Sequence, residues 1–275
     1  MELVDLHTHS CYSDGSLMPS DLVALAKKQG VQILSLTDHD EIAGLALMKE
    51  ATEKAGIKFI PGVEITANWG SRSIHVVGLN FDQENTFLIE FLEKIRSDRK
   101  LRAQKMASIL SNLGMPGAWE GLESAVTNPN LISRKHFADW MIAQGFVKTH
   151  QEAFDKWLGD QCPAYVPCTQ NKIKETVQVI LQAGGVPVLA HPGRYKLEEW
   201  ALQELLDEFK NSGGIAIEVC SGSHNASDVS KFTKIALEEG FEASTGSDFH
   251  SRASKFMPGC QLSLPETLVP VWHRF

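Results

Sequence analysis

The stretch VDLHTHSCYSDGS covers residues 4–16 and begins with two apolar residues, Val4 and Leu6, at alternate positions. Two histidines, His7 and His9, follow at once and are also separated by one residue. In an extended strand, residues i and i+2 project to the same side, so both imidazoles can contact one metal ion. The same alternation predicts that Val4 and Leu6 point the other way, into the layer between sheet and helices. Alternatively, both histidines could lie on the solvent face of an edge strand, or the pair could belong to a polar turn.

Composition places the chain among ordinary globular proteins. Its 275 residues, 43% of them hydrophobic, are enough for a large core in one elaborated domain or one domain with an insertion. The net charge of −8 argues against a protein that coats extended nucleic acid, although a terminal phosphate remains a possible ligand. There is no apolar run of membrane-spanning length and no signal-peptide pattern, which predicts a cytoplasmic protein without membrane contact.

Short apolar runs alternate with helical patterns over much of the chain, which predicts an α/β fold with parallel strands and helical crossovers. Candidate strands lie at residues 2–9, 31–40, 58–66, 74–81, 186–195, 215–222 and 241–251. Candidate helices between them lie at residues 19–30, 42–56, 173–185, 198–214 and 227–239.

The rhythm changes after residue 86. A long charged amphipathic pattern covers residues 86–113, and the segment from there to about residue 165 shows helical patterns without a convincing strand. We therefore expect a first part of the α/β domain at 1–98, a helical insertion or cap at 99–165, and the second part at 166–275.

The ends of the candidate strands and the loops after them carry imidazoles and carboxylates. These are His7, His9, Asp14, Asp38, His39, Asp40, Glu64, His75, His191, Asp248 and His250, which include six of the ten histidines. In parallel α/β folds, ligands gather at the carboxyl ends of strands. Mixed imidazole and carboxylate donors suit Zn²⁺, Mn²⁺ and Fe²⁺, so the pattern predicts a metal site. Asp5, on the histidine side of its strand, is expected to orient the ligands. The alternative is a set of buried histidines bonded to backbone carbonyls.

Six motifs in sequence order resemble those of the polymerase and histidinol phosphatase (PHP) superfamily of metal-dependent phosphoesterases. They are HTHSCYSDG (7–15), LTDHD (36–40), GVEI (62–65), IHVVGLN (74–80), LAHPGRY (189–195) and GSDFH (246–250). Residues 131–145 and 218–224 resemble the branch that contains nucleoside 3′,5′-bisphosphate phosphatases and ribonuclease AM. The resemblance implies a distorted (β/α)₇ barrel with a small helical insertion domain and three divalent metal ions, with manganese expected and zinc or iron as alternatives.

The resemblance also implies how the ligands are shared among the ions. One ion would be held by His7, His9 and Asp248, a second by His75 and His191 with Glu64 bridging the two, and a third by Asp14, His39 and His250. Catalytic roles would fall to Asp14, His39 and Arg194. The loop GDQCPAYV (159–166) departs from relatives, which tend to carry a Gly-Lys pair there, so the resemblance does not extend to a basic contact in this loop.

Two divalent ions about 3.5–4 Å apart can share a hydroxide that attacks phosphorus at neutral pH, while nearby cations stabilise the charge on the phosphoryl oxygens. The candidate substrate contacts are Ser133, Arg134, His136, Arg194, Ser223 and His224. The guanidinium of Arg134 could hold a second phosphate of the substrate. A solvated surface charge is the alternative for Arg134, and a polar turn is the alternative for Ser223 and His224.

These features together favour a phosphoesterase that acts on nucleotides. It would remove the 3′-phosphate from nucleoside 3′,5′-bisphosphates, degrade short 5′-phosphorylated RNA in the 5′-to-3′ direction, or do both. The expected partners are thus a nucleotide or a short RNA 5′ end, and the oligomeric state stays open. The alternatives are another phosphatase of this superfamily that acts on a small phosphomonoester, an amidohydrolase-like enzyme, and a module that keeps the fold without catalysis.

Overall fold

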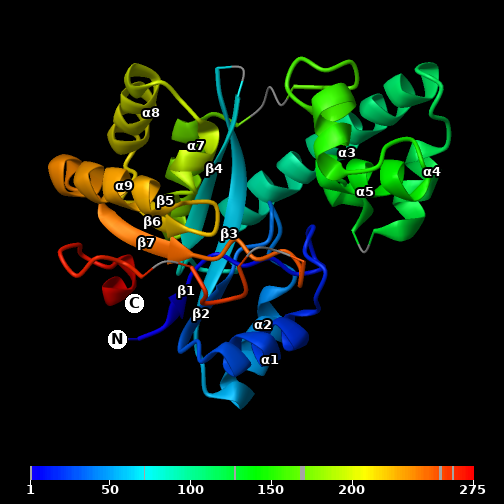
Figure 1. The fold of residues 1–275 in the computed structure, drawn as a ribbon. Coiled ribbons are helices and arrows are strands. Elements are labelled where there is room, and N and C mark those ends of the chain that lie inside the picture. The colour runs from blue at the N-terminus through cyan, green and yellow to red at the C-terminus, as the bar shows by residue number, and fades with distance from the viewer. Residues whose placement is uncertain (1, 71, 127, 168–170, 254–255, 262) are drawn as a thin grey trace.

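The computed structural model describes residues 2–70, 72–126, 128–167, 171–253, 256–261 and 263–275 (Figure 1). Seven strands form one sheet in the order of the chain. They are β1 (Val4–Asp5), β2 (Ile33–Leu36), β3 (Lys58–Trp69), β4 (Arg72–Leu79), β5 (Val186–Leu189), β6 (Ala216–Ser221) and β7 (Glu242–Gly246).

The helices of the described residues alternate with the strands as predicted, apart from the group of helices after β4. On the α/β part they are α1 (Pro19–Gln29), α2 (Leu45–Ala55), α7 (Ile173–Gln182), α8 (Glu199–Asn211) and α9 (Ala226–Glu239). Between β4 and β5 lie α3 (Thr86–Asn112), α4 (Ala118–Ala125), α5 (Arg134–Ala143) and α6 (His150–Ala153). None of these helices is long and apolar enough to cross a membrane.

The sheet curls into a nearly closed barrel. Strands β1 to β3 and β5 to β7 pair in parallel, whereas β4 pairs antiparallel with both of its neighbours, β3 and β5. The first and last strands meet where the backbone N–H of Leu6 donates to the carbonyl of Thr245 at 2.9 Å. The predicted α/β fold and distorted barrel are therefore confirmed, and the distortion lies at β4.

The inside of the barrel is filled by apolar residues that alternate along the strands. Val4, Leu6, Ile33, Val77 and Val188 belong to one buried cluster that contains strand residues and the C-terminal segment but no residue of the long helices. The expectation that Val4 and Leu6 face the helices is therefore wrong. They share the inward face with Ile33, beside which the pairing of β1 and β2 places Val4.

A second apolar cluster lies between the sheet and the surrounding helices. Leu34, Leu36 and Ile65 from the strands pack there against helix residues such as Leu22 and Leu205, all fully buried. Burial of a side chain of this size contributes about 1.5–3 kcal/mol. Short strands such as β5, in which all four residues are buried, read as continuous apolar runs because both faces are covered.

Helix α3 joins the barrel to a separate group of helices (Figure 1). Its first half packs Leu88 and Leu92 on the barrel, and its second half buries Met106 and Leu110 with Phe137 in an apolar cluster of its own. The helix runs without interruption through residues 98 and 99. The domain limits at 98 and 165 stay a prediction.

Candidate metal centre

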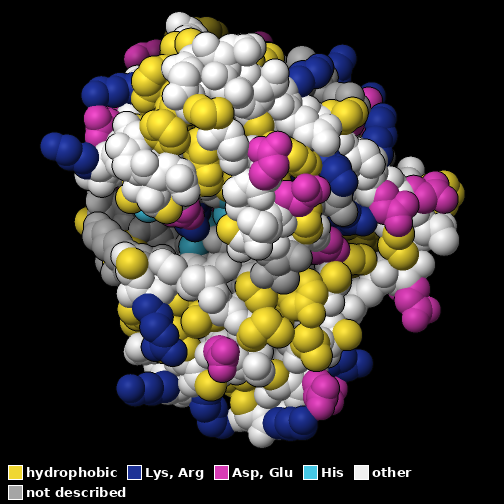
Figure 2. All heavy atoms as spheres, turned by 90° about the vertical axis from the view of Figure 1, so that its right-hand side faces the viewer, with side chains coloured by type: hydrophobic (Ala, Val, Ile, Leu, Met, Phe, Trp, Pro, Cys, Tyr) yellow, Lys and Arg dark blue, Asp and Glu magenta, His cyan; other side chains and the backbone are white. Residues whose placement is uncertain are grey.

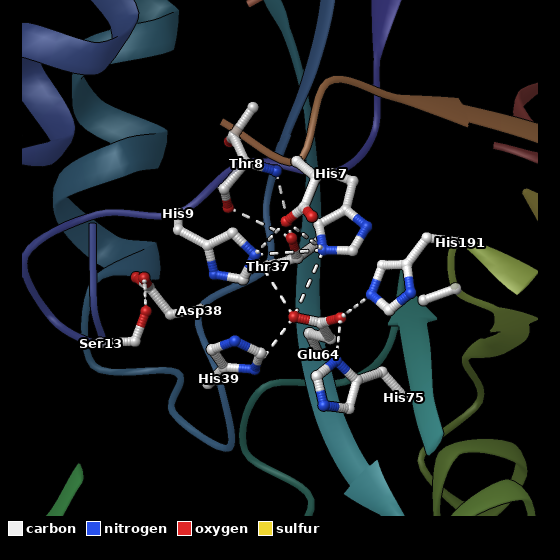
Figure 3. Close-up of polar contacts among 12 residues, drawn as sticks. His7, Thr8, His9, Ser13, Thr37, Asp38, His39, Glu64, His75 and His191 are labelled. Atoms are coloured by element: carbon white, nitrogen blue, oxygen red, sulfur yellow. Dashed lines mark hydrogen bonds and ion pairs between the residues drawn. The ribbon is translucent and has the colours of Figure 1, made fainter. Parts of the chain in front are cut away.

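The nine residues predicted as ligands lie together at the carboxyl end of the barrel. Figure 3 labels His7, His9, His39, Glu64, His75 and His191 among them. The Nε2 atoms of His7 and His9 lie 3.1 Å apart, so the two side chains do project toward a common point. Both atoms are 3.3 Å from Oε2 of Glu64. Asp248 completes this group, with Oδ1 3.3 Å from Nε2 of His9.

Glu64, on β3, lies at the centre of the site (Figure 3). Its Oε1 is 2.7 Å from Nδ1 of His75 and 3.0 Å from Nε2 of His191. Its Oε2 faces His7 and His9, and is 2.9 Å from Nδ1 of His39. One carboxylate thus stands between two groups of imidazoles, as a bridging ligand would.

Asp14 reaches the site from the first loop. Its Oδ1 lies 3.1 Å from Nε2 of His250 and 3.9 Å from Nε2 of His39. The loop folds back on itself at Gly15, where a Cβ atom would lie 2.5 Å from the carbonyl oxygen of His9. The glycine that follows Asp14 in the sequence is therefore required by this close approach.

The donor atoms fit divalent metal ions. They form four overlapping groups, and within each group all donor atoms lie within 4.8 Å of one another. Buried oxygens of Asp14, Glu64 and Asp248 have no hydrogen-bond partner in the described part of the chain. Such atoms are rare in folded proteins unless water or an ion satisfies them. Nitrogen and carboxylate donors without thiolate suit the harder first-row metals.

Electrostatics in the centre are strongly perturbed. Burial disfavours the charged form of His9, yet the nearby carboxylates of Asp248 and Glu64 raise its pKa to about 10. Burial lowers the pKa of His39 to about 4 against the pull of Glu64 and Asp14. Burial also opposes ionisation of Glu64, but the imidazoles of His39, His75 and His7 hold its pKa well below its usual range. The carboxylates are thus negative, as metal ligands must be.

Backbone strain accompanies the ligands. His191 has φ of 31° and Asp248 has φ of 54°, both in the left-handed region that non-glycine residues seldom adopt. Such conformations persist where the surrounding structure enforces them, and they cluster at functional sites.

Glu218 holds two of the predicted ligands, and sequence reasoning missed it. This residue of β6 is buried, its Oε1 lies 2.5 Å from Nδ1 of His7, and its Oε2 accepts a hydrogen bond from the backbone N–H of His191 at 2.7 Å. A glutamate inside the apolar run IAIEVC (215–220) was the signal that could have found it.

Three other acidic residues hold the segments around the site and do not belong to the donor groups. Asp5 accepts hydrogen bonds from the backbone N–H groups of Ser247 and Gly259, which ties β1 to the last loops, and from that of His7 at 3.3 Å, so it contacts the backbone of one predicted ligand and not its ring. Asp38 accepts from Ser10 and Ser13 and shapes the first loop. Asp40 pairs with Arg99 of α3.

A hollow opens above the centre, with histidine side chains recessed in it (Figure 2). We call it the central hollow; its walls include Asp14, His39, His75, Lys135 and Arg194. Arg194 is half exposed and donates from Nη1 to Oδ2 of Asp248 at 2.9 Å. Lys135 is a second residue that sequence reasoning missed.

Some of the other predicted substrate contacts line the hollow, whereas others hold the backbone around it. Ser133 and Arg134 line the hollow on the side of the insertion, and Ser223 lines it on the side of the barrel. His136 uses Nδ1 to accept from the backbone N–H of Ser133, which caps α5.

His224 is a correction. Its Nδ1 lies 2.9 Å from the carbonyl oxygen of Val219, and its Nε2 accepts from the backbone N–H of Gly193 at 3.0 Å. Both ring nitrogens are therefore engaged by the backbone, and the buried ring stacks on Phe232. His224 thus supports the turn that carries Arg194, in agreement with the polar-turn alternative, and neither ring nitrogen is left for a substrate.

Comparison with known proteins finds relatives over nearly the whole chain. The 3′,5′-nucleoside bisphosphate phosphatase of Chromobacterium violaceum is 38% identical over 274 residues, which cover 99% of this chain and 96% of that protein. The 5′-3′ exoribonuclease Rnm of Escherichia coli is 35% identical over 273 residues, which cover 98% of this chain and 93% of that protein.

Solved structures show the same fold over nearly the whole chain. A structure from Chromobacterium violaceum, described as an amidohydrolase with bound sulfate and no metal, has a TM-score of 0.94 at 38% identity and covers 98% of this chain and 95% of its own. A metal-dependent phosphoesterase from Bifidobacterium adolescentis has a TM-score of 0.82 at 28% identity and covers 98% and 92%. Residues 5–116 match the family model described as the PHP domain. The chain therefore belongs to the PHP family of metal-dependent phosphoesterases.

Proposed function

We propose that this protein is a metal-dependent phosphoesterase acting on nucleotides in the cytoplasm. It hydrolyses the 3′-phosphate of nucleoside 3′,5′-bisphosphates, removes nucleotides from the 5′ end of short phosphorylated RNA, or does both. The observation that carries this proposal is the set of nine converging donors at the floor of a hollow whose walls hold Arg194 and, on the insertion side, Arg134. The names of two relatives, a bisphosphate phosphatase and an exoribonuclease, support it.

Three divalent ions would be held by the nine residues, and manganese is the metal we propose, with zinc or iron as alternatives. His7, His9 and Asp248 would hold one ion, His75 and His191 a second, and Asp14, His39 and His250 a third, with Glu64 between the first two. Such ions, when bound, supply positive charge for the phosphoryl oxygens and a water that is nucleophilic at neutral pH.

The protein's own residues place the phosphate and stabilise its charge. The guanidinium of Arg194 lies beside Asp248 at the metal centre, from where it can reach a phosphoryl oxygen in the hollow. Arg134 and Ser133 stand on the insertion side of the same hollow. A substrate with two phosphates can therefore be held at both ends, one at the centre and one under the insertion.

The two activities need the same arrangement. A nucleoside bisphosphate and an RNA 5′ end both present a terminal 5′-phosphate and, one sugar away, a 3′ phosphoester. If the 5′-phosphate lies at Arg134, the 3′ phosphoester lies toward the metal centre in both substrates. No extended nucleic-acid surface is required, in keeping with the net charge of −8.

An amidohydrolase activity is the second candidate, because one structural neighbour carries that description. That neighbour also binds sulfate, a tetrahedral anion like phosphate. The bridging position between the two groups of imidazoles is taken by the carboxylate of Glu64, whereas a lysine bridge between two ions would favour C–N hydrolysis. The phosphoester is therefore the favoured substrate.

The test uses purified protein supplied with Mn²⁺ and two substrates, adenosine 3′,5′-bisphosphate and a short 5′-monophosphorylated RNA. The expected products are inorganic phosphate with adenosine 5′-monophosphate from the first, and nucleoside 5′-monophosphates from the second. Turnover of one substrate alone selects between the two activities. Absence of release from both would overturn the proposal.

A further inference from the structure

Arg134, at the first position of α5, is engaged by a carboxylate of the insertion. Its Nη1 lies 3.0 Å from Oδ1 of Asp160 and donates to the carbonyl oxygen of Leu158 at 3.3 Å. The side chain of Asp160 is 55% exposed, against 32% for Arg134, so water screens this ion pair on one side. The pair is therefore weak enough for another anion to displace.

Arg134 does not depend on Asp160 for its position. The central carbon of its guanidinium lies 5.8 Å from the ring centre of Phe154 and 5.4 Å from that of Tyr165. Two aromatic rings and the carbonyl of Leu158 thus fix the guanidinium on their own. The carboxylate of Asp160 therefore acts on Arg134 mainly through its negative charge and contributes little to the orientation of the guanidinium.

The pair stands where the second phosphate of a substrate would bind. Arg134 lines the central hollow together with Asp14, His75 and Arg194, whereas Asp160 does not line it. A phosphate in the hollow that binds Arg134 must share the guanidinium with the carboxylate of Asp160, which engages Nη1, or displace it. A terminal phosphate, which carries a charge near −2, is a strong competitor.

We propose that Asp160 is a specificity-determining residue that weakens the binding of a second substrate phosphate at Arg134. This inference rests on the proposed function and adds to it the residue that sets how tightly a 5′-phosphate is held. In the absence of substrate Asp160 neutralises Arg134, and in its presence the phosphate must share the guanidinium with the carboxylate or replace it. The ion pair between Asp160 and Arg134 lowers the affinity for every ligand that binds Arg134, and it does not affect ligands that do not contact this residue.

The size of the effect follows from the exposure of the pair. An exposed ion pair of this kind corresponds to roughly a 1.5- to 5-fold change in an equilibrium constant. The variant Asp160→Asn removes the charge and retains a side chain of the same shape. We expect it to lower KM for adenosine 3′,5′-bisphosphate by about 1.5- to 5-fold with kcat unchanged. Asp160→Lys should lower KM further, because it replaces the competing charge by an attracting one.

The experiment measures KM and kcat for adenosine 3′,5′-bisphosphate and for adenosine 3′-monophosphate, which lacks the 5′-phosphate. Asp160→Asn should change KM for the first substrate alone. Asp155→Asn is the matched control, because it makes the same change of charge in the same insertion and Asp155 contacts Gln151 instead of a cation. In a chain that already carries Arg134→Met, Asp160→Asn should have no effect.

Four results would overturn the inference. A higher KM in Asp160→Asn would mean that Asp160 positions Arg134. Equal changes for both substrates, or equal changes in Asp155→Asn, would mean a general effect of charge. An unchanged KM for the bisphosphate would mean that Asp160 has no influence. If the wild-type protein turns over neither of these substrates nor the 5′-monophosphorylated RNA, the proposed function falls with the inference, whereas turnover of the bisphosphate with an unchanged KM overturns the inference alone.

Discussion

The carboxylate of Glu218 lies 2.5 Å from Nδ1 of His7 and, through its other oxygen, accepts the backbone N–H of His191 at 2.7 Å. His7 and His191 would serve different metal ions, so one buried glutamate orients ligands of both. A partner on the far nitrogen of a ligating histidine fixes the ring orientation and its basicity.

Glu218→Gln should therefore weaken metal binding. The amide cannot present two acceptor oxygens, so either His7 or His191 loses its partner, and metal affinity should fall roughly 10- to 100-fold. Titration of the chelator-treated protein with Mn²⁺ against a coloured chelator measures this. Glu242→Gln on the adjacent strand is the control, because Glu242 pairs with the surface residue Arg274 and should leave affinity unchanged. Equal affinity in Glu218→Gln and the wild type would contradict the role of Glu218.

Asp14→Ala should abolish most of the activity while the fold survives. Asp14 comes from a loop and faces His39 and His250, so its loss removes one proposed ion without opening the barrel core. Loss of one group that stabilises transition-state charge costs about 10²- to 10³-fold in kcat. Circular dichroism checks the fold, and His39→Ala should behave alike. Unchanged rates in both variants would remove the third ion from the proposal.

Arg134→Ala should act on substrates with two phosphates. Removal of a charged hydrogen bond to phosphate costs about 1.5–3 kcal/mol, or roughly a 10- to 100-fold increase in KM for adenosine 3′,5′-bisphosphate. Adenosine 3′-monophosphate, which does not reach the insertion, should show a small change. A comparable loss on the monophosphate would place Arg134 at the reacting phosphate instead.

Arg99→Met should destabilise the protein. Nε of Arg99 lies 2.5 Å from Oδ2 of Asp40, and both side chains are buried. Removal of one partner leaves a buried charge uncompensated, which costs roughly 3–5 kcal/mol of unfolding free energy. Urea unfolding of the chelator-treated protein measures it. Arg274→Met, which breaks an exposed pair with Glu242, should cost less than about 1 kcal/mol. Similar losses in the two variants would show that the buried pair is no more important than the surface pair.

The barrel and the clustering of nine donors could be predicted because both follow from local patterns. Strand ends of a parallel sheet meet at one edge, so His7, Glu64 and His191 could be placed near one another from their strands alone. The long helical pattern at 86–113 agrees with α3. The direction in which Val4 and Leu6 point could not be predicted, because it depends on how the sheet closes.

Contacts between segments that are distant along the chain could not be predicted from the sequence either. Glu218 meets His7 across 211 residues, and His224 meets Gly193 across 31. Polar residues at a strand end look alike whether they bind a substrate or hold a turn, so His224 was assigned to the substrate. Its real partners are backbone groups, which no pattern of side chains reveals.

The most direct test of the account is a crystal of the protein grown with Mn²⁺ and examined by anomalous diffraction. We predict anomalous peaks among the nine donors, with Glu64 shared between two of them. Side chains of these nine residues that contact no anomalous scatterer would contradict the account, and the proposed hydrolysis of phosphate esters would fall with it.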